Sequence, residues 1–418
     1  MISIMENRNV LISGASVAGP ALAYWLRRFG FNPTVVERSS QLRGGGYAVD
    51  FRGAAHLSVL ERMGVLDEIR HQQTHLGALT YVDADNRPLA KMPAEIFAGD
   101  VEILRGDLGR ILYEATRHGT EYLFGDSIES LEQGPDGVRV TFERAAPRTF
   151  DLVVGADGLH SNVRRLVFGD ESLFMRDLGL HVSIFTTTNF LGLDHAGLLY
   201  SVPGKTASIY SAHDNTEAIA MLYFTAPSIE YDYHDVQRQK EIVAEMFAGG
   251  GWQVPQLLDE MWQAPDFYLD STNQVHLDRW SRGRVALIGD AGYAAGPGGN
   301  GTGTAVVAAY ILAGELAAAD GDHHAAFARY ERAMRGYVAG GQKQAAGGRD
   351  FLAPATWKKI HQRNRFFKML PYLPVKGLIR KMSSRTATAI KLPAYASAPA
   401  DAERNTPHQS SPGSAPTR

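Results

Sequence analysis

The chain of 418 residues contains no cysteine. Disulfides, thiolate metal sites, iron–sulfur clusters and a cysteine nucleophile are therefore excluded, and the absence fits a reducing compartment. The chain also lacks an excess of positive charge, since 42 Lys and Arg residues face 45 Asp and Glu residues and the formal net charge is -3. A general nucleic-acid binder needs a basic surface, so no nucleic-acid partner is expected.

Long hydrophobic runs are missing as well. The N-terminal segment is interrupted by Glu6 where a signal peptide would be apolar, whether translation starts at the first residue or at Met5. The longest apolar stretch, 305–319, contains Gly314 and Glu315 and is shorter than the ~20 residues that span a membrane. We therefore expect a buried helix there, no membrane partner and a cytoplasmic location.

What is present is the composition of an ordinary globular enzyme, with 44% hydrophobic and 21% charged residues. The N-terminal pattern is strand, helix, strand over 9–15, 17–29 and 32–37, and such a unit begins a doubly wound parallel sheet. The fold class is therefore expected to be α/β. The stretch 178–224 is rich in Thr, Val, Ile and Tyr, which predicts a separate antiparallel sheet. Further helices are predicted at 56–63, 107–117 and 302–319, further strands at 151–155 and 285–288, and a hairpin turn at 136–137.

The first turn of this unit carries the glycine pattern GASVAG. Gly14 permits the tight turn, and Gly19 lets helix and strand approach closely. The backbone N–H groups of Ser16, Val17 and Ala18 open the helix and can receive a phosphate at its positive dipole end. Ser16 stands where a glycine is usual, and its hydroxyl can donate a hydrogen bond to a pyrophosphate. A glycine turn with a purely structural role is the alternative.

Glu37 ends the second strand, 23 residues after Gly14. A carboxylate at this place can accept both hydroxyls of an adenosine ribose and would repel a 2′-phosphate. The pattern therefore favours FAD or NAD over NADP as the bound dinucleotide, although Arg38 beside it weakens the electrostatic part of that argument. A surface Glu–Arg pair is the alternative interpretation.

Two later motifs each place an aspartate between a buried strand and a helix. Asp157 lies in GADGLHSNVRR and Asp290 in GDAGYAAGPGGNGTGTA. A carboxylate near a diphosphate is favourable only where it binds hydroxyls, and the ribityl chain of FAD supplies them. The loop with Pro297, Gly301 and Thr302 offers backbone N–H groups that can receive the negative charge of a reduced flavin. Either aspartate alone can be a helix N-cap, but the ordered set of motifs favours FAD.

In this order the motifs resemble those of the class A FAD-dependent monooxygenases with the p-hydroxybenzoate hydroxylase fold. The resemblance covers about residues 8–335 and includes Arg105, which precedes an Asp-Leu pair at a helix start. It implies that Arg105 contacts the pyrophosphate or the ribityl chain of FAD. Tyr293 departs from the family pattern, because a histidine usually follows the Gly-Asp pair there.

The segment GGGYAVDFRG is most similar to the tetracycline-inactivating branch of that family, through Gly46, Asp50, Phe51 and Gly53. The similarity implies that this segment lies beside the isoalloxazine, with Gly46 and Asp50 in the cofactor site. It also implies that Arg43 contacts the flavin or the nicotinamide phosphates.

The resemblance implies an enzyme that uses NADPH or NADH and O2 to hydroxylate a planar, aromatic or polyketide-like small molecule through a flavin C4a-hydroperoxide. A tetracycline is one candidate, and its modification would confer antibiotic resistance. Because the flavin carries the chemistry, no catalytic side chain is assigned, and no metal site is expected. A monomer or weak homodimer is expected. The alternative is an FAD oxidoreductase of the same fold that does not oxygenate, of the dehydrogenase or prenyl reductase type.

The expected organisation is a Rossmann-like FAD-binding domain and a second domain built on the antiparallel sheet. The first is formed by 1–75, 100–170 and 280–345, and the second by 76–99 and 171–279. Alternate side chains of a strand face opposite ways, so only part of the second sheet's aromatic residues can line a pocket. The candidates are Phe185, Phe190, Tyr200, Tyr210, Tyr223 and Phe224, and for each of them individually core packing is the favoured interpretation.

The C-terminal part is expected to be helical and basic from 346 to 395. We interpret its charged side chains as a solvated helix face packed on the body, with a role at a membrane surface as the weaker alternative. The Ala/Pro/Ser-rich tail, 396–418, is expected to be disordered.

Overall fold

A mostly parallel sheet of six strands contains the N-terminal unit. The computed structural model describes residues 7–226, 229, 231, 232, 234–372 and 387–396. The strands lie in the order β17-β18-β11-β1-β2-β7, and all neighbours are parallel except β17 and β18. Their bounds are β1 Asn9–Ser13, β2 Asn32–Glu37, β7 Glu121–Phe124, β11 Leu152–Gly155, β17 Ser281–Arg282 and β18 Val285–Leu287.

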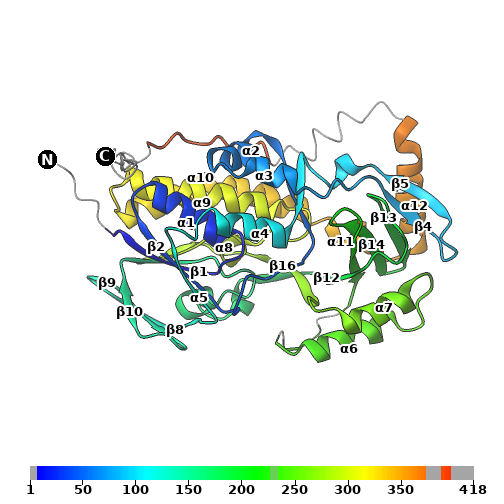
Figure 1. Cartoon of the computed structure of the whole chain (residues 1–418), viewed down its shortest axis with the longest axis horizontal. Coiled ribbons are helices and arrows are strands. Elements are labelled where there is room, and N and C mark those ends of the chain that lie inside the picture. Colours follow the sequence, from blue (N-terminus) through cyan, green and yellow to red (C-terminus); the bar gives the residue numbers. More distant parts are fainter. Residues whose placement is uncertain (1–6, 227–228, 230, 233, 373–386, 397–418) are drawn as a thin grey trace, which may run out of the picture.

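Helices cover one face of this sheet, and α5 with a small antiparallel sheet covers the other (Figure 1). The small sheet has the order β10-β9-β8, and its β8–β9 hairpin turns at residues 135–136, one position before the predicted turn. The helices on the first side are α1 Ala18–Arg28, α2 Gly53–Arg62, α3 Leu66–His71, α4 Arg105–Glu114, α9 Gly301–Ala318 and α10 His323–Ala345. The elements on the second side are α5 Asn162–Phe168, β8 Ile128–Gly134, β9 Gly137–Phe142 and β10 Arg148–Phe150.

The helix α9 forms the centre of the core. It is apolar on every side and almost entirely buried, which is the pattern of an internal helix rather than of a surface one. Among the described residues it is the one helix long and apolar enough to cross a membrane, and 72% of it is buried inside the molecule. The prediction of a buried helix at this place is confirmed.

The second sheet has seven strands in the order β16-β12-β15-β14-β13-β4-β5. All neighbours are antiparallel except β13 and β4, which are parallel. Helices α6 Val236–Phe247 and α7 Val254–Gln263 cover one face of it. The strands are β4 Leu79–Val82, β5 Pro88–Met92, β12 Met175–Thr188, β13 Gly197–Val202, β14 Lys205–Ala212, β15 Glu217–Phe224 and β16 Tyr268–Val275.

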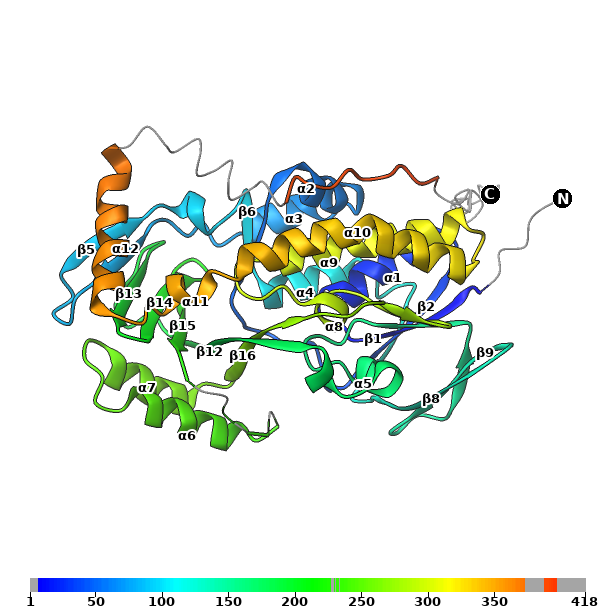
Figure 2. The same ribbon diagram turned by 180° about the vertical axis from the view of Figure 1, so that it is seen from behind.

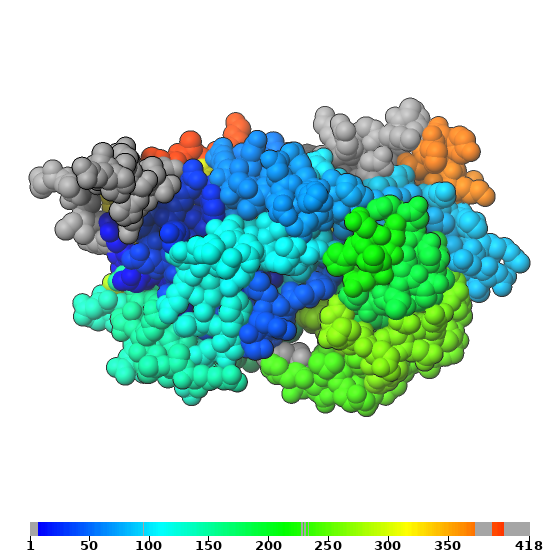
Figure 3. All heavy atoms as spheres, viewed as in Figure 1, coloured from blue at the N-terminus to red at the C-terminus, as the bar shows by residue number. Residues whose placement is uncertain are grey.

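A two-stranded ribbon lies between the two sheets. It consists of β3 Ala48–Phe51 and β6 Val101–Leu104, with Asp50 opposite Glu102. The backbone N–H of Ala48 donates to the Tyr210 hydroxyl of β14 at 3.0 Å, which attaches the ribbon to the second sheet. In Figure 3 the stretch leading into β3 (blue) lies between the region of α4 (cyan) and strands of the second sheet (green).

In the C-terminal part, the described residues are helical over only part of the predicted segment. Helix α10 runs along the molecule toward the second sheet (Figure 2), and α11 Gly348–Leu352 and α12 Trp357–Met369 follow it. Helix α12 lies against β5 and β13. Residues 387–396, expected to be helical, have neither helix nor strand and return over α9 and α10. The tail 397–418 and the segment 373–386 lie outside the described residues.

Four further short elements occur in the described part of the chain. They are η1 Ala94–Ile96, η2 Glu171–Leu173, α8 Asp290–Tyr293 and η3 Leu370–Tyr372.

Candidate cofactor and substrate site

Two glycines, Gly14 in the turn after β1 and Gly19 in the first turn of α1, tolerate no side chain. Gly14 has φ +107°, and a Cβ there would lie 2.5 Å from the carbonyl oxygen of Ala156. A Cβ at Gly19 would lie 1.9 Å from the Gly14 carbonyl oxygen. Both glycines therefore allow the start of α1 to descend onto the strand ends. The N–H groups of Ser16, Val17 and Ala18 open this helix, where backbone donors have no partner inside the helix.

Arg105 is the first residue of α4 and reaches this turn. Its Nε and Nη2 donate to the Ser16 hydroxyl at 3.3 and 3.2 Å. A Cβ added at Gly46 would lie 3.7 Å from the Arg105 Cβ, so the loop before β3 passes close beside the arginine. The structure thus brings a guanidinium, a hydroxyl and a helix N-terminus together at one place, which is a suitable receptor for a pyrophosphate. Ser16, which stands where a glycine is usual, thus has a hydrogen-bond partner in Arg105 that the sequence does not reveal.

Glu37 lies at the carboxyl end of β2, beside the same turn. Its carboxylate accepts hydrogen bonds from the backbone N–H of Ala15 at 2.8 Å and of Ser39 at 2.9 Å. These two bonds fix the carboxylate next to the start of α1 and leave acceptor capacity on both oxygens.

Two exposed arginines follow Glu37 in the loop toward β3. Arg43 donates through Nε to the Ser39 hydroxyl at 2.9 Å. Although its side chain is exposed to solvent, partial desolvation by the surrounding protein lowers the pKa of Arg43; the charges of Arg38 and Arg105 act in the same direction, and Glu37 opposes them. The loop therefore adds positive charge close to the turn.

Asp290 begins α8 and faces the start of α9. A Cβ at Gly301 would lie 3.5 Å from its Oδ1. Among the described residues no hydrogen bond to this carboxylate is found, and solvent reaches the side chain. Desolvation by the surrounding protein nevertheless raises the pKa of Asp290, and the charge of Arg105 opposes that rise. A carboxylate held in this way is ready to accept hydroxyl donors.

Asn300 is a site residue that the sequence did not indicate. It precedes α9 in the left-handed conformation, with φ 57°, and its Nδ2 is buried without a hydrogen-bond partner. Gly301 and Thr302 form the first turn of α9, and Pro297 lies in the loop before it. Asp290, Gly301 and Gly299 line a common cavity with Tyr293, Ala295, Thr304 and Val338. An unpaired amide donor and a helix N-terminus beside that cavity suit the electronegative edge of a flavin.

Asp157 differs from Asp290, because its carboxylate is occupied by the protein. It accepts hydrogen bonds from the Ser161 hydroxyl at 2.5 Å, the backbone N–H of Val163 at 3.0 Å and the Ser13 hydroxyl at 3.3 Å. Burial raises the pKa of Asp157, and these bonds lower it. Its side chain organises the start of α5, which is the helix-capping alternative.

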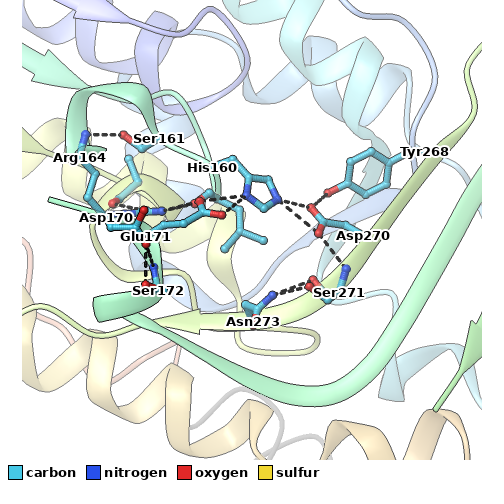
Figure 4. Close-up of polar contacts among 12 residues, drawn as sticks. His160, Ser161, Arg164, Asp170, Glu171, Ser172, Tyr268, Asp270, Ser271 and Asn273 are labelled. Carbon is cyan, nitrogen blue, oxygen red and sulfur yellow. Dashed lines mark hydrogen bonds and ion pairs between the residues drawn. The ribbon is translucent and has the colours of Figure 1, made fainter. Parts of the chain in front are cut away.

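His160, in the same motif, joins the two sheets (Figure 4). Its Nδ1 lies 3.1 Å from the nearer oxygen of Glu171, and its Nε2 lies 3.1 Å from the nearer oxygen of Asp270 on β16. The Tyr268 hydroxyl also donates to Asp270, at 2.7 Å. Burial lowers the pKa of His160, but the two carboxylates outweigh it and raise the pKa to about 9. His160 is therefore a cation at neutral pH and connects α5 with the second sheet.

The ribbon contains a second set of buried charges. Asp50 is ion-paired with Arg52, whose Nη2 donates to the Phe97 carbonyl at 2.7 Å. Opposite Asp50, Glu102 accepts from the Thr74 hydroxyl at 2.5 Å, and burial raises its pKa to about 7. The charge of Asp50 is thus balanced by Arg52, two residues further along the chain.

The faces of the second sheet divide the predicted pocket aromatics. Phe185 and Phe224 are buried on the face that α6 and α7 cover, and Phe190 and Tyr200 pack against the same cluster. These four side chains therefore pack in the core on the helix-covered side, which is the core-packing interpretation, and do not line a pocket on the other face. Tyr210 lies on the opposite face, in a cluster with Ala48 and Leu104 of the ribbon, and Met221 packs against that cluster. The Tyr223 hydroxyl contacts the Met221 sulfur at 3.3 Å.

Tyr293 does not reach the pocket with its hydroxyl. The Tyr330 hydroxyl donates to the Leu287 carbonyl at 3.1 Å, so the Tyr293 hydroxyl, 2.8 Å away, donates to Tyr330. The ring is 4% exposed and packs on Trp280. Tyr293, which stands where the family pattern has a histidine, therefore serves mainly to pack the core.

Comparison with known proteins assigns the chain to a class. The model of the FAD binding domain family matches residues 7–332. A flavin-dependent monooxygenase of an unknown prokaryotic organism is 40% identical over 398 residues, which is 93% of this chain and 100% of that protein. An uncharacterized protein of Mycobacterium tuberculosis is 50% identical over 338 residues, 79% of this chain and 91% of that protein. The crystal structure of tetracycline destructase Tet(51) has a TM-score of 0.81 at 36% identity and covers 94% of this chain and 100% of its own.

Fold, site and relatives together define an FAD-dependent monooxygenase of the p-hydroxybenzoate hydroxylase type. The chain belongs to the FAD binding domain family. Its likeness to a tetracycline destructase agrees with the branch that residues 44–53 indicate, and the names of its relatives favour the oxygenating enzyme over the non-oxygenating alternative.

Proposed function

We propose that this monooxygenase takes electrons from NADPH or NADH and hydroxylates a planar, oxygenated ring compound of the aromatic or polyketide type. Tetracyclines are the first candidates, and their modification would confer antibiotic resistance. The observation that carries the substrate class is the face of the second sheet turned toward the ribbon, where Tyr210, Met221 and Tyr223 gather. The similarity of the fold to that of a tetracycline destructase supports the same class.

The residues of the site fit FAD along its length. We assign the pyrophosphate to Arg105, Ser16 and the start of α1, and the adenosine ribose to Glu37. The hydrogen bonds that hold Ser16 under Arg105 support the first assignment. The unpaired carboxylate of Asp290 suits the ribityl hydroxyls, and the unpaired amide of Asn300 suits the pyrimidine edge. Bound FAD supplies the redox chemistry, in which one atom of O2 enters the substrate.

The protein's own contribution is to bind, orient and exclude water. Tyr210 accepts a hydrogen bond from the backbone N–H of Ala48, and among the described residues no acceptor for its own proton is found, so we assign that proton to a substrate oxygen. Burial raises the pKa of Tyr210, which keeps that proton on the hydroxyl at neutral pH. The hydroxyl thus provides a fixed donor in an apolar surrounding, which suits a carbonyl or phenol group on a ring system.

The test combines cofactor and substrate analysis. The purified chain is expected to hold one non-covalent FAD, to oxidise NADPH or NADH, and to add one oxygen atom to a polycyclic phenol or tetracycline, as seen by mass spectrometry. Tyr210→Phe should raise KM for the ring compound while FAD retention is unchanged. Oxygen transfer confined to small aliphatic amines or thioethers would refute the proposed substrate class. Failure to oxidise either nicotinamide would refute the proposed electron donor.

A further inference from the structure

The end of the molecule formed by α11 and α12 exposes a concentration of large apolar side chains. Eleven such side chains are exposed among the described residues, and five of them fall within residues 351–372. They are Phe351, Trp357, Phe366, Met369 and Tyr372, which is 87% exposed. Isolated exposed apolar residues are common, so it matters which of these side chains share one side of α12.

The same segment is strongly basic. Residues 351–372 contain five Lys and Arg residues and no Asp or Glu, whereas the whole chain has a net charge of -3. Lys359 is ion-paired with Asp350. Lys358, Arg365 and Lys368 are exposed, and within the described residues no ion pair is found for them. Basic residues and exposed apolar side chains therefore occur together in this segment.

Helix α12 is held firmly, so that this surface faces outward. Ile360, Asn364 and Phe367 form its buried stripe. Arg363 donates to the Ser201 hydroxyl at 2.9 Å, and its guanidinium lies 4.0 Å from the centre of the Tyr81 ring. With 3.6 residues per turn, Lys358, Arg365, Phe366 and Met369 lie on the side away from the buried stripe, and Trp357 and Lys368 lie at its edge. Figures 1 and 2 both show α12 (orange) at one end of the molecule, on the outside of the second sheet.

We propose that this basic, aromatic surface docks on a lipid bilayer that carries anionic headgroups. Lysine and arginine side chains bind such headgroups, and Trp, Tyr, Phe and Met side chains enter the boundary with the acyl chains. A symmetric contact with a second copy of the chain would bring Lys358, Arg365 and Lys368 against an identical set of charges. Charge complementarity therefore selects the anionic bilayer. The surface attaches the enzyme at the end of its second sheet and leaves the candidate FAD site free.

The experiment is vesicle flotation of the FAD-loaded full chain. The protein should float with vesicles of phosphatidylcholine mixed with phosphatidylglycerol, and much less with phosphatidylcholine alone. Raising the salt concentration should weaken binding, because screening reduces the attraction. Lys358→Glu with Arg365→Glu should lower the partition coefficient about tenfold or more, since each basic residue near an anionic surface contributes about a factor of five. Trp357→Ser with Phe366→Ser and Met369→Ser should lower it on the same vesicles.

Matched control variants make the same kinds of change at other positions, which shows whether the effect depends on the location of the residues. Arg139→Glu with Arg332→Glu makes the same change in net charge at exposed sites on β9 and α10. Leu173→Ser with Trp262→Ser removes exposed apolar side chains elsewhere. Both controls should bind vesicles like the unchanged protein, and all variants should keep their flavin and melting temperature. Equal loss of binding in variants and controls, equal flotation with neutral vesicles, or no flotation at all overturns the proposal. A dimer that only the α12 variants dissociate would assign the surface to a second copy instead.

Discussion

Asp290 and Asp157 occupy similar places in two motifs, but their hydrogen bonds differ. The carboxylate of Asp157 is taken up by Ser13, Ser161 and Val163, whereas no bond to Asp290 is found among the described residues. We expect Asp290→Ala to weaken FAD binding about tenfold or more, since a hydrogen bond to a charged group contributes ~1.5–3 kcal/mol. Asp157→Ala should weaken binding less.

Titration of the apoprotein with FAD, followed by flavin fluorescence, measures both affinities. Thermal unfolding of the apoproteins supplies the complementary readout. Asp157→Ala should lower the melting temperature, because it leaves the Val163 N–H in the first turn of α5 and two hydroxyls without their acceptor, while Asp290→Ala should not. Flavin retention unchanged in a folded Asp290 variant would contradict the assignment.

His160 should make stability depend on pH in the alkaline range. Its folded pKa of about 9 lies above the ordinary value of 6.5, so the pairing with Glu171 and Asp270 stabilises the fold fully below about pH 6.5 and is lost as pH rises through 9. The shift corresponds to on the order of 3 kcal/mol at most. The melting temperature should therefore fall more steeply between neutral pH and pH 10 in the unchanged protein than in His160→Gln. If the melting temperatures of the two proteins changed with pH in parallel, the contacts of His160 with Glu171 and Asp270 would make no pH-dependent contribution to stability.

At the scale of elements, local patterns were predictable and long-range pairings were not. The bounds of β2 match the prediction, and α1 differs from it by one residue at each end, because both depend on the apolar spacing of neighbouring residues. The parallel pairing of β13 with β4 joins segments more than a hundred residues apart, and no local pattern encodes it. The consecutive residues Tyr223 and Phe224 point to opposite faces of β15, so only the position of α6 and α7 decides which of them is core.

The candidate site divides in the same way. Gly14, Gly19, Glu37 and Asp290 stand out because strand ends and glycine turns are visible in sequence. Asn300 did not stand out, because its unpaired amide becomes evident only when the surrounding atoms are placed. A GGNG sequence before a predicted helix, with asparagine at the left-handed position, was the available signal.

At the start of α9, Gly303 leaves no room for a side chain. A Cβ at Gly303 would lie 2.1 Å from the His56 ring. That ring is fixed, since Nδ1 accepts from the backbone N–H of Arg52 and Nε2 consequently donates to the Tyr337 hydroxyl at 2.5 Å. Gly303→Ala should therefore destabilise the protein by ~1–3 kcal/mol.

The matched control is Gly336→Ala in α10, where an added Cβ has no heavy atom within 4 Å. It should stabilise by ~0.5–1 kcal/mol through helix propensity alone. Urea unfolding of the two variants decides the matter, and equal midpoints would show that His56 moves aside at little cost.

At the scale of the whole molecule, residues 387–396 form a strap that lies against α9 and α10. The Tyr395 hydroxyl donates to Glu315 at 2.8 Å, and the Tyr310 hydroxyl donates to the Pro393 carbonyl at 2.7 Å. A Cβ at Gly314 would lie 2.1 Å from the Tyr395 ring, so α9 makes room for it. At its other end the strap contacts Tyr337, which bonds His56 and thereby the loop after β3.

This arrangement predicts a sharp boundary in truncation experiments. A chain that ends at residue 396 keeps the strap and should retain the melting temperature and flavin content of the full chain. A chain that ends at residue 386 loses the buried Ala387 and the Tyr395 ring, which packs on Tyr310 and Phe29. Removal of one well-packed aromatic ring costs ~3–5 kcal/mol in a full core, and Tyr395 is partly exposed, so a melting temperature lower by a few degrees is expected.

Tyr395→Ala in the full-length chain isolates the ring from the rest of the strap and should account for most of that loss. Ending the chain near residue 351 removes α12 as well, which exposes the Tyr81 ring where Phe367 stacks at 5.7 Å. That chain should be the least stable of the four. Differential scanning fluorimetry on all four proteins orders them. If the chain that ends at 386 is as stable as the chain that ends at 396, the contacts of Tyr395 with α9 add nothing to stability, and residues 387–396 lie on the surface of the fold without stabilising it.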